Sequence, residues 1–195
     1  TFTVLTSDDV QFAAGLSEPI TGSDPTLLQA AYDKAAATLP GKPSLIIGFG
    51  PLLASVSGDF YVDNLSKISG GVPLFGSLAV DHYNDYHDAC VLYNGKGYTD
   101  RFAFVLLQGP IQPHFYIASI SNETLFRDKG VVTASNGNQL QTVNNLPVSD
   151  YLLSLGLTKN AEGQIEGINA FPFIVDYNDG TQPVVRVMFA LTPEG

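Results

Sequence analysis

The chain has 195 residues, of which 45% are hydrophobic and 14% charged, and can therefore bury the core of one large or two small globular domains. Its 19 acidic side chains outnumber nine basic ones, and the formal net charge of −10 argues against binding to nucleic acid or an anionic membrane surface. The single cysteine, Cys90, cannot form an intrachain disulfide, which fits a reducing compartment such as the cytoplasm. No apolar run approaches the length of a membrane span, and no signal peptide is visible.

The first part of the chain is predicted to alternate strands with helices. Asp24 can cap a helix whose first turn contains Pro25, and Gly70 is a suitable end for a second helix. The alternation of strands and helices predicts a partly parallel sheet with covering helices. The predicted strands cover residues 1–5, 10–15, 44–49 and 72–75, with the last two buried, and the predicted helices cover residues 25–39 and 60–68.

The second part is predicted to consist mainly of β-hairpins. Asn94-Gly95, Asn136-Gly137 and Asn178-Asp179-Gly180 are turn signals, and each separates two apolar stretches. The expected fold is therefore a mixed, partly parallel β-sheet with covering helices and several β-hairpins, and a layered α-β-β-α sandwich is the alternative. Further elements are expected as a central strand at 102–107, a strand at 111–120 and a helix at 147–155.

The stretch from residue 70 to residue 88 indicates a binding site. The predicted strand passes through Gly76-Ser77 and leads into a polar and aromatic segment at residues 81–88. Glycine lets a ligand approach the backbone, and polar groups fix its orientation. Residues 48–51 follow another predicted strand but complete no phosphate-binding motif, and we expect no cofactor. The predicted ligand-binding residues are Gly48, Gly50, Gly76, Ser77, Asp81, His82, His87 and Arg101.

Residues 81–88 also contain the residue types of a zinc site, Asp and His. His82 and His87 are five positions apart, however, which suits neither one helix face nor one strand face. A solvated loop rich in Asp and Asn is the structural explanation of the same residues. The spacing therefore favours contacts to a polar ligand over a metal site.

Other reactive side chains each have a structural explanation. Cys90 lies in an apolar stretch, which favours a buried cysteine over a catalytic thiol. Ser77 lacks the Gly-x-Ser-x-Gly elbow of a hydrolase. Arg101 can anchor a ligand carboxylate or form a surface ion pair next to Asp100. Residues 114–116 are expected to pack within a strand.

Several short segments occur in an order that resembles the FIST domain, a sensory module of signalling proteins. Gly15-Leu16-Ser17 precedes the helix that begins at Asp24-Pro25, as in that family. The other matching segments are residues 44–49 (SLIIGF), 72–77 (VPLFGS), 130–138 (GVVTASNGN) followed by Leu140, and 145–152 (NLPVSDYL).

The resemblance implies a non-enzymatic, cytoplasmic ligand-sensing domain that binds a small polar metabolite such as an amino acid and acts on an output signalling domain. It also implies a FIST N-like domain at residues 1–157, a linker at 158–167, and the start of a C-terminal FIST-like part at 168–195 that packs as a hairpin. The family supplies no catalytic residue. Alternatives are a metal-dependent or hydrolytic enzyme that uses residues 81–88 and a protein-interaction domain, and association into a homodimer stays open.

Overall fold

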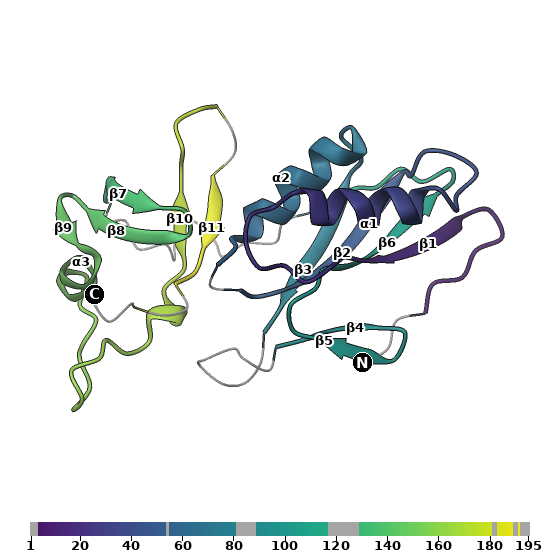
Figure 1. The fold of residues 1–195 in the computed structure, drawn as a ribbon. Helices are drawn as coiled ribbons and strands as arrows, with labels where there is room; N and C mark the ends of the chain where they lie inside the picture. The colour runs from purple at the N-terminus through teal and green to yellow at the C-terminus, as the bar shows by residue number, and fades with distance from the viewer. Residues whose placement is uncertain are drawn as a thin grey trace. The chain divides into compact units, whose positions relative to one another are not determined.

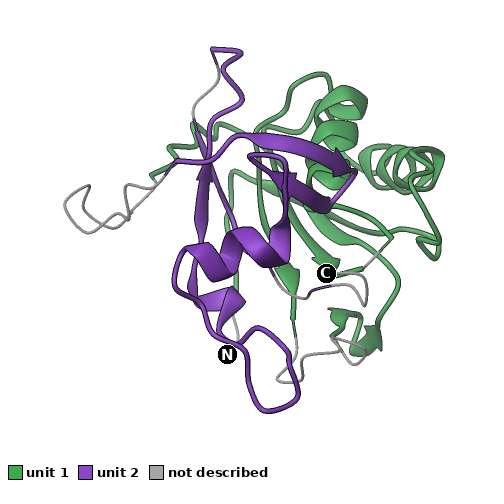
Figure 2. Cartoon of the chain, turned by 90° about the vertical axis from the view of Figure 1, so that its left-hand side faces the viewer, with its two compact units in different colours: residues 1–118 green, residues 119–195 purple. Residues whose placement is uncertain are grey.

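The computed structural model describes residues 4–53, 55–80, 89–116, 129–180, 183–188 and 191. The chain divides into two compact units, residues 1–118 and residues 119–195, and each is described by itself (Figure 2). The described residues form helices, β-hairpins and a sheet with both parallel and antiparallel pairs. The predicted mixed α/β fold class is therefore confirmed.

The first unit is built on a four-stranded sheet with the strand order β1-β6-β2-β3 (Figure 1). Strands β2 and β3 run parallel, and β6 is antiparallel to both β1 and β2. The apolar run predicted as a central strand is β6, which lies between two neighbours. The strands are β1 (Gln11–Leu16), β2 (Leu45–Pro51), β3 (Leu74–Ala79) and β6 (Ala103–Gln108).

Helices α1 (Thr26–Ala36) and α2 (Gly58–Ser69) cover one face of this sheet (Figure 1). The Asp24 carboxylate accepts hydrogen bonds from the N–H and the hydroxyl of Thr26, the first residue of α1, at 2.9 and 2.7 Å, although the N-cap position is occupied by Pro25 and not by Asp24 as predicted. Gly70 ends α2 with a φ of 67°, in the left-handed region that favours glycine. The core between helices and sheet includes Leu28, Tyr32, Ile46, Tyr61, Leu65, Phe102, Phe104 and Leu106.

A hairpin of β4 (Val91–Tyr93) and β5 (Lys96–Tyr98) lies on the sheet face opposite the helices (Figure 1). Its turn has positive φ angles at Asn94 (50°) and Gly95 (75°), as the Asn-Gly signal predicts. The Tyr93 hydroxyl donates a hydrogen bond to the carbonyl oxygen of Ala14 in β1, at 3.4 Å. This bond ties the hairpin to the sheet.

The second unit contains an antiparallel three-stranded sheet and a separate two-stranded hairpin. The turn between the first two strands follows Asn136, and the last two strands flank Asn178-Asp179-Gly180, which confirms both predicted hairpins. Its core includes Val148, Leu152, Leu157, Ile165 and Ile168. The elements are β7 (Val132–Asn136), β8 (Gln139–Val143), β9 (Leu146–Pro147), α3 (Val148–Ser154), the 3-10 helix η1 (Ile168–Ala170), β10 (Phe173–Val175) and β11 (Val184–Arg186).

Four strand predictions are wrong, in whole or in part. Residues 4–5 form no strand. Strand β3 starts two residues later than predicted and is largely exposed, because it lies at the edge of the sheet. Strand β2 is buried on the helix face, but Phe49 on the other face is 46% exposed. Residues 111–116 form no strand, and Pro113 within them has no N–H to donate to a ladder.

Two predictions of burial are also wrong. Cys90 is exposed, because it precedes β4 in a surface hairpin whose buried neighbour is Val91. Phe115 and Tyr116 were expected to pack, but they are 54% and 91% exposed. The packing expected for residues 114–116 depended on a strand, and no strand forms there.

Candidate functional site

The ends of the strands meet on one side of the four-stranded sheet, where β1, β2 and β3 end and β6 begins. Phe49 lies opposite both Ser77 in β3 and Ala103 in β6, and Ala103 lies opposite Leu16 in β1. This row of four residues crosses the whole sheet. Ligands of α/β proteins commonly bind at the carboxyl ends of parallel strands. The strand-end edge is defined by this row together with Ser17, Glu18, Arg101 and Phe102.

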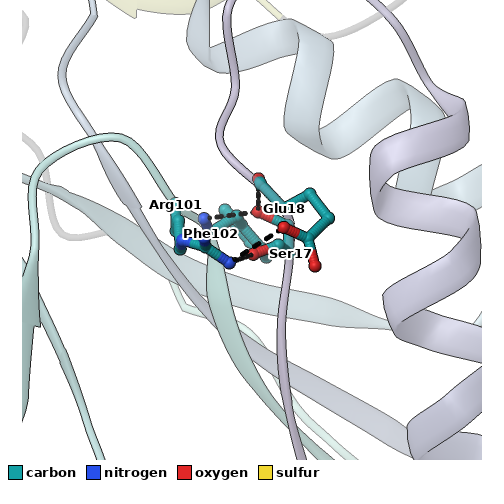
Figure 3. A network of polar contacts seen from close by, with 4 residues as sticks. All are labelled: Ser17, Glu18, Arg101 and Phe102. Carbon is teal, nitrogen blue, oxygen red and sulfur yellow. Dashed lines mark hydrogen bonds and ion pairs between the residues drawn. The ribbon is translucent and has the colours of Figure 1, made fainter.

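Ser17 joins β1 to β6 at this edge through an exchange of backbone and side-chain hydrogen bonds (Figure 3). The Ser17 N–H donates to the carbonyl oxygen of Phe102 at 2.9 Å, and the Phe102 N–H donates to Ser17 Oγ, also at 2.9 Å. The hydroxyl in turn donates to the Glu18 carbonyl oxygen at 2.8 Å. Because Ser17 Oγ accepts from the Phe102 N–H, the Ser17 carbonyl oxygen is available to accept a hydrogen bond from Arg101.

Arg101 is held from several directions (Figure 3). Its Nη1 donates to the Ser17 carbonyl oxygen at 3.0 Å and forms an ion pair with Glu18 Oε2 at 3.3 Å. The guanidinium carbon lies 5.5 Å from the centre of the Tyr98 ring, within the range of a cation–π contact. The Arg101 side chain is 25% exposed and the Glu18 side chain 71% exposed. The guanidinium therefore has a defined position, whereas its carboxylate partner is largely in solvent.

A second cation lies near the same tyrosine. Lys96 Nζ is 5.2 Å from the centre of the Tyr98 ring. Lys96 and Arg101 are two of only nine basic residues in a chain with a net charge of −10. The hairpin and the start of β6 thus bring positive charges together in an otherwise acidic protein.

The predicted glycines have a packing role in the structure. A Cβ atom on Gly48 would lie 2.5 Å from Cζ of Phe102, and one on Gly50 would lie 3.0 Å from Cδ2 of the same ring. A Cβ atom on Gly76 would meet the carbonyl oxygen of Gly48 in the adjacent strand. Close approach of an aromatic ring and of the neighbouring backbone therefore explains glycine at these positions.

The ring of Phe102 continues this packing towards α2. It stacks on Tyr61 with ring centres 4.9 Å apart and planes at 18°. The Tyr61 hydroxyl donates to the carbonyl oxygen of Pro51 at 3.4 Å, and burial raises the pKa of Tyr61 to about 12. The helix side of the strand-end edge is therefore filled with aromatic side chains.

Ser77 and Arg101 belong to the other side of the sheet. Side chains alternate along a strand, so Ser77 shares the face of Ala103, opposite to that of Phe102. Arg101 precedes β6, and its guanidinium contacts Tyr98 of the β4–β5 hairpin, which lies on the same face. Ser77 is exposed, and its hydroxyl donates to the carbonyl oxygen of Leu78 at 3.2 Å. The fold thus brings these two predicted residues to one edge and one face, with β2 between them.

Asp81, His82 and His87, which were predicted to bind the ligand, lie outside the described residues. Among the residues that are described, no three His, Cys, Asp or Glu side chains come together to hold a metal ion. In the same part of the chain, no helix is long and apolar enough to cross a membrane.

Several residues of the edge were not predicted from the sequence. The partner of Arg101 in its ion pair is Glu18, 83 positions away in the chain, and not the neighbouring Asp100. The antiparallel register of β1 and β6, continued by two residues beyond Leu16, places Glu18 opposite Arg101. The sequence did contain a signal for the contact between Tyr98 and Arg101. The Asn94-Gly95 turn predicts a hairpin, and its second strand ends at Tyr98, three residues before Arg101.

The fold defines a class of α/β domain in which a mixed sheet has helices on one face and polar groups at its strand-end edge. The chain belongs to the FIST family, because the sequence model of the FIST N domain matches residues 1–146. This match confirms the resemblance read from the sequence. FIST domains are a family of sensory domains in signalling proteins and are not generally enzymes. No curated protein matches the chain.

Proposed function

We propose that this chain is the ligand-sensing part of a cytoplasmic signalling protein. It binds a small polar metabolite, such as an amino acid, at the strand-end edge, and binding changes the state of an output domain without catalysis. Membership of the FIST family supports the sensory role. The observation that carries the choice of site is Arg101, whose guanidinium is fixed by the buried Ser17 at the ends of the strands.

In this proposal the predicted residues have different tasks. Arg101 pairs with a carboxylate of the ligand, and the exposed hydroxyl of Ser77 offers a hydrogen bond on the same face. Gly48, Gly50 and Gly76 support the site through the close packing of strands and rings beneath it. Asp81, His82 and His87 lie outside the described residues and stay predicted ligand-binding residues.

Sensing requires that the ligand binds two states of the protein with different affinity, because equal affinity shifts no equilibrium. The proposed domain organisation is a ligand-sensing domain at 1–157, a linker at 158–167 and the start of a C-terminal FIST-like part at 168–195. Phe173 and Met188, from the last of these segments, pack against the cluster that contains Val148 and Leu152. That contact supports a C-terminal hairpin that packs on preceding residues.

A thermal-shift screen against metabolites, including all amino acids, tests the sensory function. A ligand at about 100 times its Kd stabilises the protein by about 2.7 kcal/mol, which is roughly 5–11 °C in Tm for a chain of this size. Arg101→Lys keeps the charge but removes the planar fork, and we expect it to reduce the shift. The absence of any stabilising metabolite would reject the proposal.

A protein-interaction role is a second candidate, because the sheet face opposite the helices carries exposed aromatic residues. Phe12, Phe49 and Phe75 are 39%, 46% and 59% exposed, and exposed apolar side chains of this kind can take part in binding a partner or a second copy. Light scattering over a range of concentrations measures self-association. A dimer that Phe75→Ser disrupts, together with a negative metabolite screen, would favour this candidate.

A further inference from the structure

We propose that Glu18 acts as a resident competitor in a carboxylate-binding site that Arg101 forms with Tyr98 and Lys96, and that a ligand carboxylate displaces it. The inference rests on the proposed sensory function. It adds that the ligands are carboxylates and that Glu18 competes with them for Arg101. It starts from the geometry of the ion pair between Glu18 and Arg101.

The guanidinium is positioned before any ligand arrives. The Ser17 carbonyl oxygen accepts from Arg101 Nη1, and Ser17 itself is fully buried and tied to Phe102. Tyr98 contacts the same guanidinium. A guanidinium carries five N–H donors in a planar fork and can bind both oxygens of a carboxylate in parallel. An arginine fixed in this way loses little conformational freedom when it binds such a group.

Glu18 uses only part of this capacity. Its ion pair joins one oxygen, Oε2, to one nitrogen, Nη1, at 3.3 Å. With 71% of its side chain exposed, Glu18 is easily replaced, since exposed ion pairs typically shift an equilibrium by only about 1.4- to 5-fold. A ligand carboxylate that makes two parallel hydrogen bonds would bind more strongly than this single contact.

The backbone around Glu18 allows the exchange without unfolding. The Ser17 N–H donates to the Phe102 carbonyl oxygen at 2.9 Å, and the Ile20 N–H donates to the Asp100 carbonyl oxygen at 2.7 Å. These two bonds hold the chain on both sides of Glu18. Rotation of the Glu18 side chain is therefore sufficient to free the guanidinium.

The surrounding charge favours an anion. Lys96 and Arg101 both approach the Tyr98 ring, at 5.2 and 5.5 Å from its centre. The remainder of this acidic chain repels anions in general. Lys96 and Arg101 therefore attract an anion locally. Because Arg101 already pairs with the carboxylate of Glu18, we expect the ligand group that replaces it to be a carboxylate as well.

The test follows the side-chain Nε–H signal of Arg101 by NMR during titration with sodium acetate, with sodium chloride used to hold the ionic strength constant. Ethylammonium chloride is the matched probe without a carboxylate. Three variants are compared with the wild type: Glu18→Gln removes the competitor, Asp100→Asn removes a neighbouring charge of the same sign, and Arg101→Lys removes the fork.

We expect acetate, and not ethylammonium, to shift the Arg101 signal. Glu18→Gln should lower the Kd for acetate roughly two- to fivefold, as expected for loss of an exposed ion pair. Asp100→Asn should change the Kd clearly less. Equal effects of the two variants would mean general electrostatics and overturn the competition, and an unmoved signal in both wild type and Glu18→Gln would overturn the site. Tighter binding of inorganic phosphate than of acetate would overturn the ligand class.

The outcome can be separated from that of the proposed function. A metabolite whose Tm shift survives unchanged in Arg101→Lys would leave the sensory function standing and refute this inference. A metabolite screen without any hit, together with the expected acetate result, would reject the sensory function and retain the carboxylate site. Each result therefore decides one of the two claims.

Discussion

Replacement of Ser17 by alanine should destabilise the first unit, because it removes the hydroxyl that joins β1 to β6. This hydroxyl is the acceptor for the Phe102 N–H at 2.9 Å and a donor to the Glu18 carbonyl oxygen at 2.8 Å. Ser17 is 0% exposed and Phe102 4% exposed, so the orphaned N–H is shielded from water. A buried donor without a partner destabilises by about 1–3 kcal/mol.

Urea unfolding, followed by circular dichroism, measures this effect. With a slope of about 2 kcal/mol per molar urea, a loss of about 2 kcal/mol moves the midpoint by roughly 1 M. Ser77→Ala is the matched control, since its hydroxyl is exposed and donates to the carbonyl oxygen of the next residue. Surface changes of this type typically alter stability by less than about 0.5 kcal/mol.

The comparison between the two serine variants decides whether the reasoning is correct. If Ser17→Ala and Ser77→Ala shift the midpoint by the same amount, the Ser17 hydroxyl is not the link between β1 and β6. Ser17→Ala should also allow the Arg101 guanidinium a wider range of positions, because the backbone at residue 17 that accepts from Arg101 Nη1 is then held less firmly against Phe102. An unchanged Arg101 Nε–H signal in that variant would contradict the proposed support of the guanidinium.

Three further predictions concern the packing and the pH dependence of the first unit. Gly48→Ala should lower the free energy of unfolding by about 1–3 kcal/mol, because the added Cβ clashes with the Phe102 ring. Gly22→Ala is the control, since there is open space around Gly22, and its Tm in thermal unfolding should stay close to that of the wild type. The side-chain and backbone hydrogen bonds from Thr26 hold the pKa of Asp24 below its ordinary value of 3.8, so its stabilising effect is present above that pH and is lost as the pH falls through the folded-state pKa. The difference in urea midpoint between Asp24→Ala and wild type should therefore be largest near neutral pH and shrink as the solution is acidified, and a difference that does not change with pH would contradict this. Burial raises the pKa of Tyr61 from 10.0 to about 12, so stability should fall as the pH rises between these values, and Tyr61→Phe should lose more of that dependence than Tyr116→Phe.

Local signals were sufficient to predict most elements of the fold. The hydrogen bonds that Asp24 accepts ahead of α1, the glycine at position 70 and the Asn-Gly turns each depend on conformational preferences of a few adjacent residues. The position of a strand within the sheet is different, because it depends on pairing between distant segments. For this reason β3 was expected to be buried, although it is an edge strand.

The candidate site was predicted only in part, because it too depends on contacts between segments that are far apart in the sequence. Arg101 and Ser77 could be selected by residue type and by their place beside predicted strands. The partner of Arg101 could not, since Glu18 is 83 positions away and meets it only through the register of β1 and β6. The glycines were interpreted as openings for a ligand, but in the structure the Phe102 ring lies against Gly48 and Gly50. An aromatic residue on a neighbouring strand cannot be placed from the sequence around those glycines.

The most direct test of ligand sensing at the strand-end edge is an NMR titration with the best ligand from the metabolite screen. The account predicts that amide shifts concentrate at residues 15–18, 77–80 and 98–102, and that Arg101→Lys weakens binding. Shifts confined to the second unit, with unchanged affinity in Arg101→Lys, would contradict it.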